Sequence, residues 1–70
     1  MLTQTKNIST EAIRIRNAIA SGMVCCADRK TTQQVLLLTE GWEIIGGVMH
    51  KIIAKHIGVG IYEIKTKRAN

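Results

Sequence analysis

The chain has 70 residues, of which 46% are apolar, and it carries a formal net charge of +5 at pH 7. This length excludes more than one domain, and the basic balance favours anionic partners such as nucleic acid, acidic protein or anionic lipid. So short a chain cannot bury all of its aliphatic side chains on itself. We therefore expect a homodimer or another protein partner to cover the remainder.

The amino-terminal residues MLTQTKNIST lack the hydrophobic core of a signal peptide. The longest uncharged apolar run, residues 44–49, falls far short of the about 20 residues that a membrane-spanning helix needs. Cys25 and Cys26 are adjacent and have no third thiol to pair with, so they cannot form a disulfide framework. We expect a cytoplasmic protein with no membrane association.

The first predicted element is a helix that begins after Ser9. Residues 1–8 are predicted to be a flexible lead-in to a single small domain over residues 9–70. Ser9 is a candidate N-cap, and Glu11 lies in the first turn, where the helix dipole favours an acid. The apolar residues that recur at helical spacing are Ala12, Ile15, Ile19, Met23 and Cys26. Ser21 and Gly22 interrupt this pattern, so we expect the helix either to end near Ala20 or to continue through the cysteines.

A second, short helix is predicted after a polar break. Thr31 and Gln34 have the spacing of a capping box, and they precede an apolar run over residues 35–38. Gly41 is the expected end of this helix. The same run is also compatible with a buried strand, because periodicity alone does not separate the two in short apolar runs. We favour the helix.

A third helix is predicted from Trp42 to about Ile57, interrupted by Gly46 and Gly47. Two adjacent glycines weaken a helix, and here they indicate a kink or a close approach by a second helix. Apolar residues recur along this segment at three- and four-residue steps, and this stripe is the predicted protein interface. Its residues are Trp42, Ile45, Met49 and Ile52.

The carboxy-terminal segment is the part of the chain that points most directly to a partner. It holds five cations against a single acid, Glu63, over residues 51–70. A helix-turn-helix needs a small residue where its helices cross, a glycine at the turn and apolar residues on both sides. Ala54, Gly58, Val59 and Ile64 supply these features at the required spacing.

Residues 53–68, IAKHIGVGIYEIKTKR, resemble the A-x-x-x-G-V-x-x-x-x-I-x-x-(K/R) core of small helix-turn-helix regulators of temperate phages. The stretch EAIRIRNAI is also similar to the first helix of the lambdoid-phage activators of repressor synthesis. The resemblance implies double-stranded DNA as the partner, bound by a homodimer at two half-sites. A recognition helix starting near Ile61 would present Tyr62, Lys65 and Thr66 to base edges. The predicted phosphate contacts are Lys55, Lys67 and Arg68.

The alternative for residues 59–67 is a β-strand. The segment is rich in β-forming residues, and one of its faces carries Ile61, Glu63 and Lys65. The opposite face then carries Tyr62, Ile64 and Thr66. The predicted fold is therefore mainly α, a domain of three to four helices. Its carboxy-terminal segment is either a helix-turn-helix or a single β-strand at a dimer interface.

No catalytic or metal-binding pattern is present in the sequence. Cys25 and Cys26 lack the spacing of a zinc-binding pair. His50 and His56 are six residues apart, which places them on different faces of a helix. We expect no cofactor, no metal and no enzyme activity. The predicted function is a DNA-binding transcription regulator of phage type. The alternative is a small antirepressor or inhibitor that captures another protein through an isoleucine-rich surface; its binding would resist salt, whereas DNA binding weakens with salt.

Overall fold

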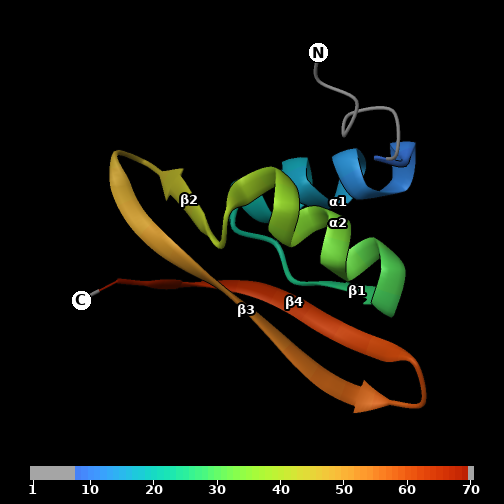
Figure 1. The fold of residues 1–70 in the computed structure, drawn as a ribbon. Coiled ribbons are helices and arrows are strands. Elements are labelled where there is room, and N and C mark those ends of the chain that lie inside the picture. Colours follow the sequence, from blue (N-terminus) through green and yellow to red (C-terminus); the bar gives the residue numbers. More distant parts are fainter. Residues whose placement is uncertain (1–7, 70) are drawn as a thin grey trace.

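The computed structural model describes residues 8–69, which form two helices and a four-stranded antiparallel sheet. Both helices lie on one face of the curled sheet (Figure 1). The strand order is β1-β4-β3-β2, so the two strands at the chain's end are the central ones. The elements in chain order are α1 (Thr10–Ala20), β1 (Cys25–Asp28), α2 (Arg29–Thr39), β2 (Trp42–Ile45), β3 (Val48–Gly58) and β4 (Ile61–Arg68).

The predicted first helix is α1, and its capping is confirmed. The Ser9 hydroxyl accepts a hydrogen bond from the Ala12 N–H at 3.1 Å, which satisfies one of the free donors of the first turn. The backbone N–H of Ser9 donates to Oε1 of Gln34, which ties the start of α1 to α2. The helix ends at Ala20, before Met23 and Cys26, so these two predicted members of its apolar stripe lie outside it. Residues 1–7 of the predicted lead-in lie outside the described residues.

The second predicted helix is α2, but it is capped by a different residue. The Asp28 carboxylate accepts a hydrogen bond from the Thr31 N–H at 2.8 Å, so Thr31 lies in the first turn rather than at the cap. The helix ends at Thr39, followed by Glu40 in the left-handed region at φ +56°. The Thr39 hydroxyl accepts from the Gly41 N–H at 3.1 Å and holds this end in place. None of the described helices is long and apolar enough to cross a membrane.

The predicted third helix is wrong, because residues 42–58 form the β2–β3 hairpin. Ile45 pairs with Val48 across the two-residue turn Gly46–Gly47, in which both glycines have positive φ (+59° and +79°). A hairpin turn of this length favours glycine at both positions, whereas a helix is destabilised by the same pair. The glycine pair was therefore a turn signal inside a pattern that was interpreted as helical.

The mainly α fold and the helix-turn-helix are also wrong, because the carboxy-terminal segment is strand β4. Ala54 and Ile64, predicted to pack where two helices cross, are instead directly opposed on β3 and β4. The alternation predicted for the strand alternative does occur in β4. This strand does not stand alone, however, since β3 pairs along one of its edges and β1 of the same chain pairs with residues 61–64 on the other.

The hydrophobic core lies between the two helices and one face of the sheet. Ile64 of β4 is 0% exposed and has Ala54 of β3 and Cys25 of β1 as its cross-strand neighbours on that face. The core residues are Ala12, Ile15, Ile19, Val35, Ile52 and Ile64. The molecule measures 34 × 32 × 16 Å, and its smallest dimension fits one helical layer packed on one sheet. The opposite face of the sheet is left without a covering element in the described part of the chain.

Candidate nucleic-acid interface

The face of the sheet that points away from the helices is here called the open face. Side chains alternate between the two faces along a strand, and the buried residues Ile52 and Ile64 identify the covered face. Glu43 also belongs to the covered side, because it contacts α1. The open face therefore consists of Cys26, Asp28, Trp42, Ile44, Met49, Lys51, Ile53, Lys55, Ile61, Glu63, Lys65 and Lys67.

A row of three side chains, here called the lysine row, crosses the open face at one end of the sheet. Lys51 of β3 is directly opposite Lys67 of β4 on one side and Trp42 of β2 on the other. Like charges directly opposite one another destabilise a sheet. The ion pairs of the described residues, Arg14–Glu11 and Arg16–Glu43, include neither lysine. A bound anion would relieve this repulsion.

The remaining charges of the open face concentrate the positive potential at the same end. Lys65 lies between Glu63 and Lys67 on the open face of β4 and is opposite Ile53. Lys55, at the far end, is opposite Glu63, and Asp28 of β1 is opposite Ile61 at the same end. The positive potential is therefore partly neutralised near Lys55 and is unopposed near Trp42.

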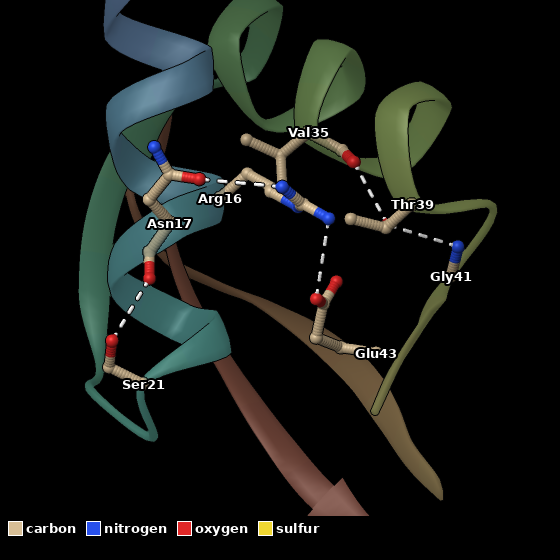
Figure 2. Close-up of polar contacts among 7 residues, drawn as sticks. All are labelled: Arg16, Asn17, Ser21, Val35, Thr39, Gly41 and Glu43. Atoms are coloured by element: carbon tan, nitrogen blue, oxygen red, sulfur yellow. Dashed lines mark hydrogen bonds and ion pairs between the residues drawn. The ribbon is translucent and has the colours of Figure 1, made fainter. Parts of the chain in front are cut away.

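A shallow hollow of about 430 Å³ runs along β2, beside the lysine row. Its lining residues are Arg16, Leu38, Thr39, Trp42, Glu43, Ile44 and Met49. Figure 2 shows Arg16 of α1 reaching toward Glu43, with an Nη2–Oε2 distance of 3.5 Å. The Glu43 side chain is only 11% exposed, so this ion pair holds β2 against α1 and offsets the one acid in the hollow.

The structure divides the six predicted nucleic-acid contacts between two faces. Lys55, Lys65 and Lys67 lie exposed on the open face. Tyr62, Thr66 and Arg68 occupy the alternate positions of β4 and point to the covered side. The ring of Tyr62 stacks on that of His56, with centroids 4.9 Å apart. The helical arrangement that would have brought all six to one DNA groove is therefore absent.

The predicted apolar interface is divided in the same way. Trp42 and Met49 are exposed on the open face, whereas Ile45 points to the covered side and Ile52 is part of the core. Lys51, a central residue of the candidate site, was missed by the sequence analysis. Its signal was the alternation of Lys51, Ile53 and Lys55, which a helical interpretation of the segment obscured.

The two cysteines lie on opposite faces of β1, and both are free thiols. Burial raises the pKa of the Cys25 thiol, and the neighbouring Cys26 and Glu11 act in the same direction. Cys25 therefore stays protonated and packs as a small apolar side chain against the core. Among the described residues no group of three or more His, Cys, Asp or Glu side chains is placed to hold a metal ion.

No protein-family model, curated protein or solved structure matches this chain. The function is therefore argued from the geometry of the open face, where exposed lysines and an exposed tryptophan share one end of the sheet. Phosphate groups and nucleobases are the chemical groups that these two kinds of side chain recognise together.

Proposed function

We propose that this chain is a small non-enzymatic regulator that binds nucleic acid through the open face of its sheet. The observation that carries the proposal is the direct cross-strand pairing of Lys51 with Lys67, next to Lys65. Nothing in the fold requires these positions to be basic, because the open face contributes nothing to the core. A row of phosphates would convert the lysine–lysine repulsion into attraction.

The proposal also explains how the charge of the chain is arranged. The net charge is +5, and four lysines but two acids lie on the open face, with both acids at the end away from Trp42. Lysines at phosphates supply affinity and orientation rather than sequence discrimination. The free thiols of Cys25 and Cys26 fit a reducing, cytoplasmic compartment, which we propose as the location.

The test is the affinity for labelled single-stranded and duplex oligonucleotides, measured by fluorescence anisotropy between 50 and 200 mM salt. Replacing both Lys51 and Lys67 with Ala should weaken binding at least about ten-fold at low salt. For single strands it should also reduce the slope of log affinity against log salt by about 1.4, because two phosphate contacts are lost.

The matched control replaces Arg29 and Lys30 with Ala. These two cations are exposed in the first turn of α2, so the control removes the same net charge away from the open face. Binding should stay within about two-fold of the parent if the lysine row is the site. Equal losses in both variants would mean that net charge alone drives binding, and no loss in either would exclude the open face.

A second candidate function, the capture of a protein partner, is favoured by an apolar surface on α2. Leu37 is 71% exposed and lines, with Gln33 and Leu36, a shallow apolar hollow on this helix. The predicted homodimer would be one use of this surface. Sedimentation equilibrium in high salt tests it: a dimer should persist there and be lost in Leu37→Glu, because an apolar interface resists salt and excludes an unpaired charge.

A further inference from the structure

The width of the sheet favours single-stranded over duplex nucleic acid as the ligand of the lysine row. Proteins that read duplex DNA with β-structure insert a two-stranded ribbon into the major groove, which is about 12 Å wide. Here the β3–β4 pair is bordered by a third strand at both ends. β1 pairs with residues 61–64 of β4, and β2 pairs with residues 48–51 of β3.

Three adjacent strands span about 10 Å between their outer backbones before any edge side chain is added. The helices occupy the other face of the same sheet, as Figure 1 shows. A structure of this width cannot enter the major groove with its open face against base edges. A single strand has no groove to enter and can lie across the face, as it does on other four-stranded sheets.

Trp42 provides the second argument, because it is placed to stack on an unpaired base. Its side chain is 44% exposed at the end of the row that contains Lys51 and Lys67. Ile44 and Met49, which are paired across β2 and β3, extend this apolar surface along the hollow beside β2. In a duplex both faces of each base are already covered by neighbouring bases, whereas in a single strand they are free to stack on an indole.

The lysines stand at the right separation from this stacking surface. Lys51 is one strand away from Trp42 and Lys67 is two strands away, which corresponds to about 5 and 10 Å along the sheet. Both lysines lie on the same side of Trp42, so they can reach neighbouring phosphates of a backbone that runs from a base on Trp42 across β3 and β4. The carboxylate of Glu43 in the same hollow is engaged by Arg16, so it does not face the phosphates as a free charge.

We propose that the open face is a binding site for single-stranded nucleic acid, in which an unpaired base stacks on Trp42 while Lys51 and Lys67 contact neighbouring phosphates. This inference rests on the proposed function and adds the form of the polymer. It assigns to Trp42 a role that duplex binding through phosphates alone would not need.

The experiment uses the fact that Trp42 is the single tryptophan of the chain, so its fluorescence reports on this site alone. The protein is titrated at low salt with oligothymidylate of about 16 nucleotides and with a duplex of equal length. The single strand should quench the emission and bind at least about ten-fold more tightly than the duplex, because only the single strand adds stacking to the phosphate contacts.

Trp42→Ala should weaken single-strand binding by about 5- to 150-fold, the range expected for the loss of one stacked base, and should leave duplex binding unchanged. Trp42→Phe keeps a ring and should recover part of the loss. Far-UV circular dichroism confirms that each variant is folded. Polyglutamate, an anionic polymer without bases, serves as the charge control and should not quench the emission.

The outcomes separate this inference from the function on which it rests. Equal affinity for both polymers, with Trp42→Ala changing neither, would overturn the single-strand inference and leave nucleic-acid binding in place. Quenching by polyglutamate as strong as that by oligothymidylate would overturn the stacking role of Trp42. Failure of the folded parent protein to bind either oligonucleotide at low salt would overturn both.

Discussion

The two faces of the sheet are built from neighbouring residues of the same strands, yet they differ in what constrains them. On β4, Ile64 is 0% exposed beneath the helices, while Lys65, the next residue, is exposed on the open face. The covered face must be apolar because it forms the core of a small domain. The open face carries no such requirement, so its lysines and its tryptophan are informative about function. In a small two-layer fold of this kind, the residues of the uncovered sheet face are therefore the ones that indicate a binding partner.

The largest expected effect tests whether the two faces contribute so differently to stability. Ile64→Ala should destabilise the domain by about 2–5 kcal/mol, because it opens a cavity in a closed core. The free energy of unfolding of a domain of this size is roughly 4–10 kcal/mol, so much of its stability would be lost. Urea denaturation followed by circular dichroism measures the change.

Ile61→Ala is the matched control, since it removes the same atoms from the open face of the same strand, where Ile61 is 46% exposed. Ile61→Ala should lower the free energy of unfolding by less than about 1 kcal/mol. Similar losses in the two variants would mean that the open face is covered in solution, which would redirect attention to self-association.

The second effect concerns the hairpin that brings Trp42 to the edge of the open face. Gly47→Ala should destabilise the protein by about 1–2 kcal/mol, because φ is +79° there and an L side chain is strained in that conformation. Gly58→Ala, at the end of β3, is the control, because Gly58 has no positive φ. The added Cβ would also have its nearest side-chain neighbour, Cβ of Ile61, 4.0 Å away. Thermal unfolding should show a clear decrease only for Gly47→Ala, and equal decreases would contradict the assigned turn.

The third effect should have opposite signs for stability and binding. Lys67→Glu places an acid opposite Lys51 and should stabilise the folded state by about 0.2–1 kcal/mol, since a like-charge pair becomes an attractive one. The same change should abolish nucleic-acid binding. Lys65→Glu faces Ile53 instead and should weaken binding without the gain in stability. If Lys67→Glu lowers the urea midpoint, the repulsion in the lysine row has been misjudged.

The smallest effect is a pH dependence at the start of α2, at the end of the sheet away from Trp42. The hydrogen bond from the Thr31 N–H lowers the pKa of the Asp28 carboxyl below its usual value. Its contribution to stability is therefore present above the usual carboxyl pKa and is lost as the pH falls through the lowered value. Asp28→Asn keeps a capping side chain, so its urea midpoint should respond less to acid than that of the parent. Identical acid responses would contradict this role for Asp28.

Local signals were sufficient to predict the helices. Ser9 as a cap, together with Ala12 and Ile15 at helical spacing, predicted α1 because these interactions span at most a few residues. Asp28 was missed as the cap of α2 because it is also the last residue of β1, a strand that the sequence analysis did not predict.

The strands could not be predicted in the same way. Trp42, Ile45 and Ile52 fit a helical stripe, although β2 and β3 place Trp42 on the face opposite the other two. The spacing of Ala54 and Ile64 is compatible with a helix-turn-helix and also with a hairpin, which places the two residues directly opposite each other. Only the β1–β4 pairing joins segments that are distant in the chain, and a pattern in one segment does not reveal it. The other two pairings are hairpins, and their apolar residues also fit a helical spacing, so the turn glycines were the remaining local signal.

The basic character of the carboxy-terminal segment, the two helices and the surplus of aliphatic side chains all follow from the order of the amino acids. Which of the basic residues lie together depends on how the strands pair. A helix groups residues three and four apart, whereas a strand groups every second residue and adds those directly opposite on its neighbours. Lys51 and Lys67 therefore meet across two strands, and Tyr62 is removed to the other face, because the register of β3 and β4 places them there.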